Sequence, residues 1–514
     1  MLQIGKPLTT NASLYDLAWD KDRIYALGSW FYKDYDDSVK YTYQTKLDMI
    51  QATLNFWTSR PLTWIGKITV IKTLCVSKLN YVLASIEPPD WFVPTITTLF
   101  EEFLWNKKPP RVRNTVMCNT YESGGLRMIN LKSHMDAQLS NWTKLLLKNK
   151  SSVPCTIIAN RSGFEFYELL KFTFDENDIP IFIPNFYKKV LRVWCTLQKE
   201  PKNVAEIQRQ SMWFNKNIRV DGKYIFYKDL YRKGAIYIND IIHQNGQFVN
   251  YESLIANFGK CISTLQYNSL KCSIPKSWRK TLKDKQIIPM NPAEECFSLE
   301  INKKVTPIKV IKSKSIYWSL QNRFEAKPSC INKWHEKYGI TFTDSKWKSI
   351  FTLAKRLTLN TKLIEFQFKI IHRTYATDSF VSNFDKTIKK KCISCNVDNN
   401  IVHTFVECIK INGIVNAVQE WLRDLFHIPL ILEIKDIIFG LNCPSKEHID
   451  YCFLHLKWFT HINRDKPTPL LFSNFCAFLY NTLCIDKQVA VNNQTEIEFY
   501  TRFQRIFQSL ENLK

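Results

Sequence analysis

The sequence predicts a mainly α-helical protein, in which a helical bundle is followed by a mixed, mostly helical C-terminal domain with a small zinc-binding module. Glycine is scarce, at 13 of 514 residues, whereas leucine, isoleucine, lysine and glutamate are common. This balance favours helices over sandwiches of short strands. Apolar residues recur at helical spacing in several long stretches. Hydrophobic residues make up 45% of the chain and charged residues 23%, so a large core is available and the composition is globular.

The first hundred residues contain one predicted strand and three predicted helices. Residues 23–31, RIYALGSWF, are strand-like because they end in bulky β-forming side chains. Residues 41–60 carry apolar side chains at helical spacing, and Pro61 ends that helix. Thr63 is a suitable cap for a second helix, which runs to a pair of prolines, and Asp90 is suited to cap a third. Three amphipathic helices in this length predict a compact bundle.

The rest of the chain alternates helical patterns with basic connecting stretches. Residues 347–372 have helical spacing, and the tail is amphipathic from Phe499 to Leu510. Residues 106–114, NKKPPRVRN, are basic and broken by prolines, so we expect an exposed loop. Residues 301–315 are rich in lysine and resemble a linker. We therefore predict five segments: 1–39, a bundle at 40–149, a basic C-terminal domain at 150–315, a helical segment at 316–385, and a zinc module with terminal helices at 386–514.

Four potential metal ligands lie close together near residue 400. Cys392, Cys395, His403 and Cys408 have the spacing C-x2-C-x7-H-x4-C. Zinc binds thiolates and imidazole tetrahedrally, and a structural site closes all four positions. Three consecutive lysines precede Cys392 and raise the local potential, which favours thiolate over thiol. The sequence therefore predicts a structural Zn²⁺ site. The alternative is a chance cluster of cysteine and histidine in a chain that bears many cysteines.

The chain is strongly basic, with 71 lysine and arginine residues against 47 aspartate and glutamate residues and a formal charge of +24. This excess predicts polyanionic partners, and we expect the chain to bind RNA. A basic protein without such a partner is the alternative, and an anionic membrane surface is a weaker one. Residues 213–234 alternate basic and aromatic side chains, as single-strand binders do, but the same aromatics suit a core equally well. The predicted nucleic-acid-binding residues are Lys67, Lys72, Lys107, Lys108, Arg111, Arg113, Arg219, Lys223, Lys228, Arg232, Lys389, Lys390 and Lys391.

Other features bear on the cellular setting and on catalysis. The 15 cysteines are scattered, and most stand alone in apolar surroundings, as buried free thiols do in reducing compartments. The N-terminal residues contain no apolar run of signal-peptide length, and no window approaches about 18 uninterrupted apolar residues. We therefore expect no membrane span and a location in the cytoplasm and nucleus. Asp36 and Asp37 lack the flanking apolar strands of a polymerase hairpin, so we interpret them as part of a solvated turn.

Several stretches, in order along the chain, resemble one protein family. They are residues 57–86 (WTSRPLTWIGKITVIKTLCVSKLNYVLASI), 100–108 (FEEFLWNKK), 122–131 (ESGGLRMINL) and 362–373 (KLIEFQFKIIHR), followed by the CCHC segment. Together they resemble the C-terminal half of the reverse transcriptase protein of non-LTR retrotransposons of the long-interspersed-element type. The resemblance covers about residues 23–465. Its most specific parts are the first stretch and the CCHC segment.

The resemblance implies a function in target-primed reverse transcription. Residues 1–39 would be what remains of the strand that leaves the palm, residues 40–149 would be thumb-like, and the rest would hold element RNA and target DNA. The four metal ligands match the family's zinc-binding pattern, and the family's endonuclease and polymerase domains would be further partners. The family is an RNA-directed DNA polymerase, but this sequence lacks the F/Y-A-D-D aspartates of its palm. We therefore expect no polymerase activity from this chain.

Two questions of origin and function stay open at this point. The chain resembles a truncated copy, a gene model broken at Met1, or a domesticated remnant. The alternative function is a domesticated, zinc-containing interaction protein with no role in reverse transcription.

Overall fold

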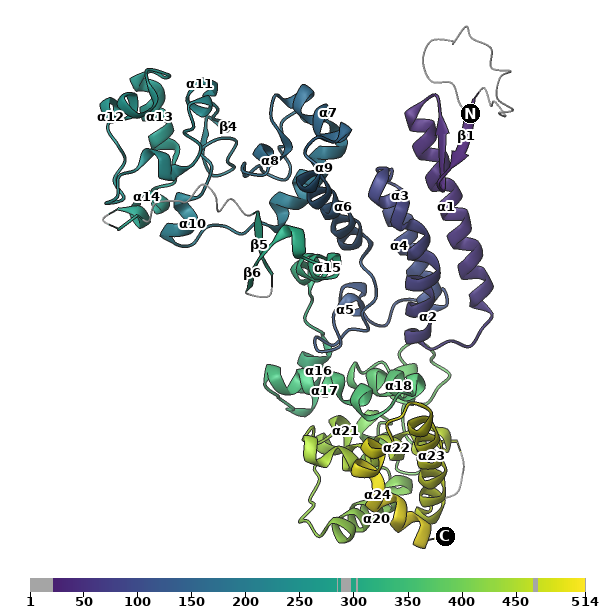
Figure 1. Cartoon of the computed structure of the whole chain (residues 1–514). Coiled ribbons are helices and arrows are strands. Elements are labelled where there is room, and N and C mark those ends of the chain that lie inside the picture. The colour runs from purple at the N-terminus through teal and green to yellow at the C-terminus, as the bar shows by residue number, and fades with distance from the viewer. Residues whose placement is uncertain (1–21, 284, 288–296, 302–303, 466–469, 514) are drawn as a thin grey trace. The chain divides into compact units, whose positions relative to one another are not determined.

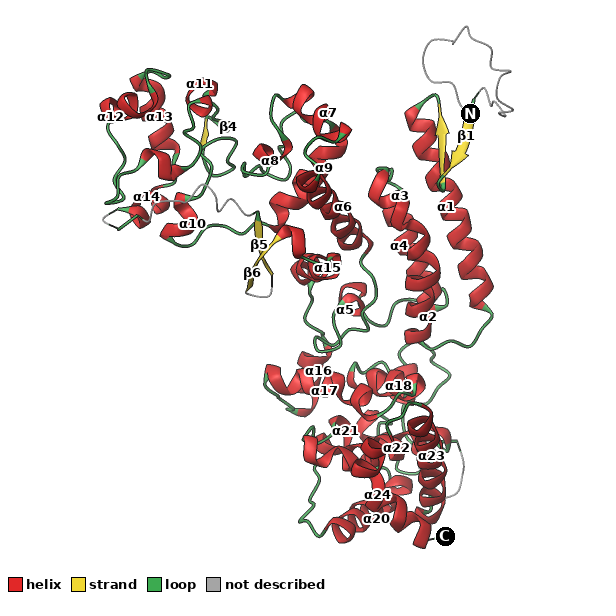
Figure 2. Ribbon diagram, in the orientation of Figure 1, coloured by secondary structure: helices red, strands yellow, loops and turns green. Residues whose placement is uncertain are grey.

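The computed structural model describes residues 22–283, 285–287, 297–301, 304–465 and 470–513. Most of the described residues are helical, and the strands β1 to β6 form three two-stranded antiparallel sheets (Figure 2). The predicted mainly α-helical class is therefore confirmed. The part of the first predicted segment that covers residues 1–21 lies outside the described residues.

The chain packs into two compact units. The first unit comprises the described residues up to Leu47, together with Lys78–Pro94 and Asn130–Arg323. The second unit comprises Asp48–Ser77, Thr95–Ile129 and the described residues from Phe324 onward. The helices of the predicted bundle therefore contribute residues to both units. The five predicted segments describe order along the chain, and that division stays a prediction.

The first unit is built around α6, Leu131–Lys148, which packs against α9, Asn185–Leu197, and α15, Ser313–Gln321 (Figure 1). Asn130 caps α6, because its side-chain oxygen accepts a hydrogen bond from the amide of Ser133 at 3.1 Å. The other α-helices and strands described within this unit are β1 (Arg23–Ala26), β2 (Ser29–Tyr32), α3 (Asn80–Ser85), α7 (Val153–Ser162), α8 (Phe166–Leu169), α10 (Val204–Gln208), β3 (Arg219–Val220), β4 (Lys223–Tyr224), α11 (Lys228–Arg232), α12 (Tyr251–Phe258), α13 (Thr264–Ser273), α14 (Lys276–Leu282), β5 (Ser298–Ile301) and β6 (Lys304–Pro307).

The second unit is built around α22, Glu447–Ile462, in which residues 449–457 are all buried. Five helices contact α22 and cover it (Figure 1). They are α17 (Asp344–Leu357), α18 (Thr361–Ile371), α20 (Ile409–Phe426), α23 (Phe472–Asn492) and α24 (Glu496–Asn512). The apolar residues predicted for the tail all lie on the buried face of α24, which confirms its amphipathic pattern. The unit also contains α2 (Trp64–Val70), α5 (Asn114–Cys118), α16 (Cys330–Tyr338), α19 (Asp378–Val381) and α21 (Ile434–Phe439), while α1 (Tyr35–Thr58) and α4 (Phe92–Trp105) cross the boundary between the units.

The region around the first predicted strand differs from the prediction in two details. Residues 23–31 lie in a hairpin rather than a single strand, because β1 pairs with β2 through a tight turn. Leu27 and Gly28 in that turn have φ angles of 50° and 78°, as a two-residue hairpin connection requires. Asp36 and Asp37 are exposed, as predicted, but they lie in the first turn of α1. There the helix dipole stabilises their carboxylates.

The second predicted helix is present but irregular. Thr63 caps it, because its hydroxyl accepts a hydrogen bond from the amide of Gly66 at 3.1 Å. The helix continues as α2, a π-helical turn at Ile71–Cys75, a 3₁₀ turn at Val76–Leu79 and α3. The third helix, α4, begins at Phe92, so Asp90 lies outside its capping position.

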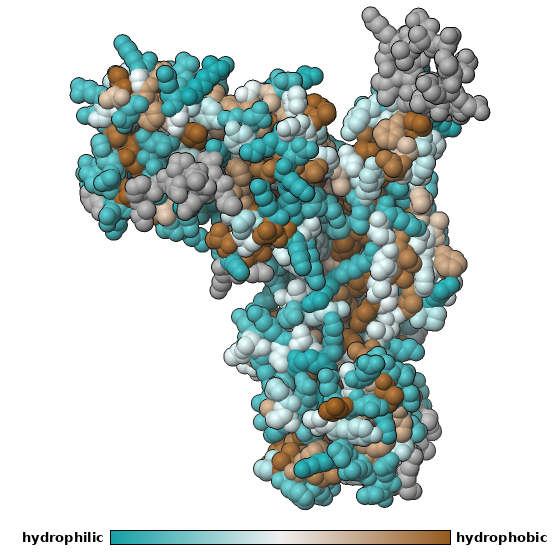
Figure 3. All heavy atoms as spheres, viewed as in Figure 1, coloured by the Kyte–Doolittle hydropathy of each residue, from teal (hydrophilic) through white to brown (hydrophobic). Residues whose placement is uncertain are grey.

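The stretch Trp64–Ser85 is the one helix, among the residues described, that is long and apolar enough to cross a membrane by length and composition. A core helix of a water-soluble protein passes the same test, and this stretch contains three lysines. The prediction of no membrane span therefore stays a prediction. On the face of the molecule drawn in Figure 3, hydrophilic residues cover most of the surface and hydrophobic residues are scattered among them.

Residues 301–315 are not the linker that their lysine content predicts. They belong to the first unit, where β5 and β6 form a hairpin and α15 begins at Ser313. Ile308 and Ile311 are buried between these elements. The described lysines of this stretch are all exposed, so the charge that suggested a linker belongs to the surface of a folded region.

A buried lysine ties α22 to its neighbours in the second unit. Lys457 is 3% exposed, and its Nζ donates hydrogen bonds to Oε1 of Gln367 and to the carbonyl oxygen of Ile438, both at 2.8 Å. Burial lowers the pKa of Lys457 to about 7, against the opposing effect of Asp450. A lysine in the unfolded chain keeps a pKa of about 10.4. Between these two pH values the unfolded chain binds more protons than the folded one, so folding becomes more favourable as pH rises.

We expect Lys457→Met to remove this pH dependence. Between pH 7 and 9, the free energy of unfolding of the wild type should rise relative to that of the variant by up to about 1.4 kcal/mol per pH unit. Urea unfolding followed by circular dichroism at several pH values measures the difference, and titration of the other groups cancels between the two proteins. A difference that stays constant over this range would contradict the assignment.

Candidate metal centre and basic surface

The first two ligands of the candidate metal centre lie on a tight turn. The amide of Cys392 donates to the carbonyl oxygen of Val397 at 2.8 Å, and the amide of Asn396 donates to the carbonyl oxygen of Cys392 at 2.8 Å. Asn396 has a φ angle of 52°, a conformation that asparagine tolerates better than most residues. The turn therefore folds the chain back after Cys395 and brings both thiols to the same side.

The other two ligands are related by one turn of π-helix. His403 begins the π-helical turn His403–Glu407, and the amide of Cys408 donates to the carbonyl oxygen of His403 at 2.9 Å. Asn400 fixes the start of this turn, because its Oδ1 accepts a hydrogen bond from the amide of His403 at 3.1 Å. The helix α20 begins directly after Cys408. The π-helical turn therefore brings His403 and Cys408 together.

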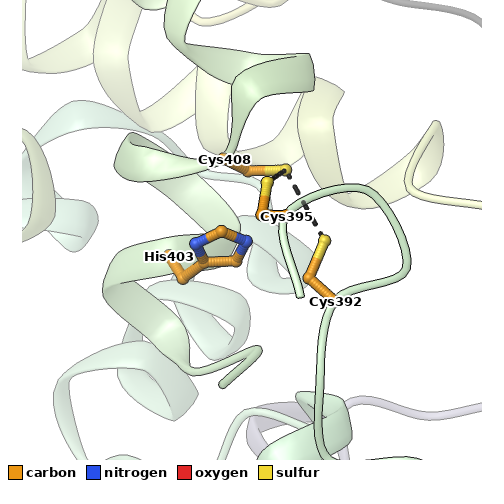
Figure 4. Close-up of side chains that lie close together, drawn as sticks. All are labelled: Cys392, Cys395, His403 and Cys408. Carbon is orange, nitrogen blue, oxygen red and sulfur yellow. Dashed lines mark hydrogen bonds between the residues drawn. The ribbon is translucent and has the colours of Figure 1, made fainter. Parts of the chain in front are cut away.

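The four side chains point toward one another (Figure 4). The Sγ atom of Cys408 lies 3.9 Å from that of Cys392 and 3.7 Å from that of Cys395. The possible ligand atoms of all four residues lie within 4.8 Å of one another. Two sulfurs bound tetrahedrally to zinc at about 2.3 Å would be separated by about 3.8 Å. The sulfur separations therefore fit a common metal ion and exclude a disulfide, whose bond is about 2.05 Å long.

The protonation of these thiols is uneven. Burial raises the pKa of Cys392, but the imidazole of His403 and the amides of Ser394 and Cys395 outweigh it and bring that pKa to about 7. Burial raises the pKa of Cys408 to about 12, and the neighbouring thiols add to the rise. One thiolate is therefore readily formed, whereas further thiolates repel one another. A divalent metal ion would remove that repulsion and displace the remaining protons.

Two further observations fit a metal site. Nε2 of His403 is buried and has no hydrogen-bond partner among the described residues. A buried ring nitrogen without a partner is costly, and metal coordination is an interaction that satisfies it. Cys408 lies at the N-terminal end of α20, where the helix dipole favours a thiolate. The four residues form a cluster that can hold a metal ion, and its donor set is compatible with zinc.

Comparison with known protein families adds no assignment, because no family model matches the chain. The resemblance to non-LTR reverse transcriptases stays an expectation.

Most of the predicted nucleic-acid-binding residues are exposed. Of the predicted loop at 106–114, residues 106–111 and Arg113 are exposed on the second unit, whereas Val112 is buried and Asn114 begins α5. The three lysines before the metal ligands are exposed on the same unit. Lys390 forms an ion pair with Asp398 at 2.8 Å, which fastens the base of the turn that carries the cysteines. The exposed members of the predicted set are Lys107, Lys108, Arg111, Arg113, Lys223, Lys228, Arg232, Lys389, Lys390 and Lys391.

The other three predicted residues are buried, half-buried or engaged in an ion pair. Lys67 is 3% exposed, and its Nζ donates to the carbonyl oxygen of Phe103 at 2.7 Å, so its ammonium group caps the last turn of α4. Lys72 is half-buried, and its pKa is lowered by burial and by the nearby Arg127. Arg219 forms an ion pair with Asp178 at 2.9 Å. The ammonium of Lys67 is therefore not available to a ligand at the surface, and the charge of Arg219 is largely balanced.

The aromatic residues of the stretch 213–234 belong to the core of the first unit. Trp213 is fully buried, and its Nε1 donates to the carbonyl oxygen of Ala235 at 2.7 Å. The ring of Phe214 stacks on that of Phe226 with a centroid distance of 4.9 Å. Tyr231 donates to the carboxylate of Glu168 at 2.7 Å. The core interpretation of these rings is therefore correct, and the basic residues between them lie on the outer side.

The structure also identifies basic residues that the sequence analysis missed. Lys337 on α16 and Arg373 after α18 line a small pocket next to Asn400. Arg373 was noted only within a stretch of family resemblance, and Lys337 has no local motif around it. Their proximity arises from the packing of α16 against the end of α18, where Nε1 of Trp334 donates to the carbonyl oxygen of Ile371 at 2.7 Å.

We expect Cys395→Ser to abolish stable metal binding, because serine does not replace a thiolate as a zinc ligand under ordinary conditions. Elemental analysis of protein purified without chelators should find about one equivalent of zinc in the wild type and much less in the variant. The matched control is Cys272→Ser, which removes an exposed cysteine in the first unit. Equal metal content in all three proteins, or none in the wild type, would contradict the site.

Proposed function

We propose that the protein binds nucleic acid through the basic surface of its second unit and that Zn²⁺ at Cys392, Cys395, His403 and Cys408 stabilises part of that surface. The observation that carries this proposal is the exposure of two basic segments, residues 106–113 and Lys389–Lys391, in the same unit as the metal cluster. Exposed cations attract phosphates and release counterions when they bind them. The formal charge of +24 supports the same partner class.

Within this proposal, the chain is the nucleic-acid-binding C-terminal portion of a reverse transcriptase of non-LTR retrotransposons. The order of the family-like stretches supports it, together with the match of the four ligands to the family's zinc pattern. In that setting the chain would hold RNA and target DNA in the cytoplasm and nucleus while a palm encoded elsewhere performs the chemistry. The zinc ion would be structural, since four protein ligands leave no open position for substrate.

A second candidate function is an interaction protein whose zinc module binds a protein partner. Large apolar side chains are exposed along the segment that leads into and carries the metal ligands, and this observation favours that candidate. Ile393 lies between the first two cysteines and is 99% exposed, while Phe384 and Ile409 are 77% and 74% exposed. Exposed apolar side chains are typical of protein-binding surfaces when they form a contiguous patch. The two candidates differ in whether the neighbouring lysines matter for function.

Neutralising Lys389, Lys390 and Lys391 to glutamine should weaken RNA binding and its salt dependence. For a single strand, loss of three phosphate contacts is expected to reduce the slope of log Kobs against log salt concentration by about 2. Fluorescence anisotropy with a labelled oligouridylate measures this slope. The control replaces three exposed lysines of the same unit, Lys348, Lys362 and Lys435, and should change the slope little. A wild type that does not bind RNA at low salt would overturn the proposed function. If the variant at Lys389–Lys391 binds RNA as the wild type does, the interaction protein is favoured.

The purified chain should not extend a primer on any template, because it lacks the aspartates that bind the catalytic metal ions of a polymerase. The assay offers RNA and DNA templates with Mg²⁺ or Mn²⁺ and follows incorporation of labelled nucleotides. An active reverse transcriptase in parallel reactions shows that the conditions support synthesis. Nucleotide incorporation by the pure protein would contradict the prediction.

A further inference from the structure

A small pocket lies next to the candidate metal centre, within the second unit. Its volume is about 140 Å³, and its walls come from α16, the residues after α18, α19 and the start of the segment that carries His403. The residues relevant to binding are Lys337, Arg373, Thr377, Ser379, Asn383 and Asn400. Pockets for drug-sized ligands measure about 300–1,000 Å³. This one therefore suits a small group, such as a phosphate with part of its sugar.

The charge of the pocket is positive. Lys337 and Arg373 line it, and no carboxylate belongs to its lining in the part of the chain that the structure describes. Burial lowers the pKa of Lys337, and the charges of Arg373 and Lys390 lower it further against the opposing effect of Asp398. Asp398 is itself paired with Lys390 at 2.8 Å. The cations are thus crowded, and an anion between them would relieve their repulsion.

The arginine of the pocket is held in place before any ligand binds. Nη1 of Arg373 donates to the carbonyl oxygen of Lys333 at 2.6 Å, and its guanidinium lies 5.4 Å from the ring centroid of Trp334. One such bond uses one of the five N–H groups of a guanidinium. A fixed guanidinium with further donors costs little entropy when it binds a phosphate oxygen.

Both basic segments predicted from the sequence contact residues that line this pocket or neighbour its lining. The guanidinium of Arg111 lies 6.0 Å from the ring centroid of Phe380, which is part of the pocket wall, and its Nη1 donates to the carbonyl oxygen of Thr374 at 3.4 Å. At the other segment, the amide of Asn399 donates to the carbonyl oxygen of Lys390 at 3.0 Å, directly before Asn400. Residues nearly 280 positions apart in the sequence therefore meet around one cavity.

The pocket is also coupled to the metal centre by a shared side chain. Asn400 lines the pocket, and its Oδ1 accepts the hydrogen bond from the amide of the ligand His403 at 3.1 Å. The turn that positions the metal ligand therefore positions part of the pocket wall. Metal bound to His403 would restrain that wall, since ligand residues and their supporting contacts move together.

We propose that this pocket binds a backbone phosphate of single-stranded RNA, with Lys337 and Arg373 at the phosphate and the polar side chains at the ribose. The proposal rests on the proposed function and assigns it a site. Ser379 carries a hydroxyl suited to pair with a ribose 2′-hydroxyl, which deoxyribose lacks, and the side-chain oxygen of Asn383 is a further acceptor. Nδ2 of Asn383 already donates to the carbonyl oxygens of Ser379 and Phe380 at 3.2 and 3.1 Å, and Oγ1 of Thr377 accepts from the amide of Phe380 at 3.2 Å, so Thr377 has its hydroxyl proton left to offer. The strand continues on one side toward the loop at 106–113 and on the other toward Lys389–Lys391.

The test compares two charge reversals in the same unit. Lys337→Glu places a carboxylate at the pocket, and the matched control Lys348→Glu makes the same change on the exposed surface of α17. Anisotropy titrations use a fluorescein-labelled oligouridylate at several salt concentrations. We expect Lys337→Glu to weaken binding at low salt at least tenfold more than the control and to reduce the salt slope by about 1 more. Circular dichroism and zinc content, expected to match the wild type, exclude a folding defect.

A second variant and a second strand complete the test. Lys337→Gln removes only the charge and should reduce RNA affinity less than Lys337→Glu does.

If Lys337→Glu and Lys348→Glu weaken RNA binding equally, and the wild type binds RNA, the pocket assignment is overturned but the proposed function is not. A wild type that does not bind at low salt overturns both. An oligothymidylate should bind the wild type more weakly than the oligouridylate, and equal affinity would overturn the role assigned to the polar side chains at the ribose.

Discussion

The convergence of three thiols and one imidazole is the constraint on which the rest of this basic surface depends. The sulfurs lie 3.7 and 3.9 Å apart, so the three thiols cannot all ionise without repelling one another, and a cation at their centre would remove that repulsion. The three lysines directly precede the turn with the first two cysteines, and the carbonyl oxygen of Lys390 accepts a hydrogen bond from the amide of Asn399. The π-helical turn with His403 is bonded to the side chain of Asn400. A single ion among the four ligands would therefore fasten the exposed turn that carries Cys392 and Cys395 to the segment of His403, whose Val402 and Phe405 are buried in the core.

The protein uses its cations in two different ways, which the net charge alone does not distinguish. Lys67 and Lys457 are buried and donate to carbonyl oxygens, so each fastens one helix to another segment of the second unit. The lysines and arginines of the loop at 106–113 and of the turn at 389–391 are exposed. A buried ammonium is expensive unless it is bonded, and a surface ammonium contributes little to stability. The first group serves the fold, and the second group is the one suited to a polyanion.

Much of the fold and of the metal site was predictable from sequence because both depend on local spacing. Helical periodicity, the cap at Thr63 and the amphipathic tail are properties of neighbouring residues, and each is present in the structure. The ligand spacing belongs to one short segment as well. The linker prediction at 301–315 failed because a hairpin and a helix start with exposed lysines have the same composition as a flexible connection. The stretch 213–234 was ambiguous for a similar reason, since aromatic rings suit both a core and a stacking surface.

By itself, the sequence determined the helical class, the excess of positive charge and the four residues able to hold a metal. Only the tertiary structure decided which cations face solvent and which far-separated ones meet. Lys67 is buried because α2 packs beneath the end of α4, while Lys337 and Arg373 share a pocket because α16 packs against the end of α18. Spacing along a chain governs contacts within a turn or a helix. Contacts between distant segments depend instead on how those elements bury their apolar faces, and no local pattern carries that information.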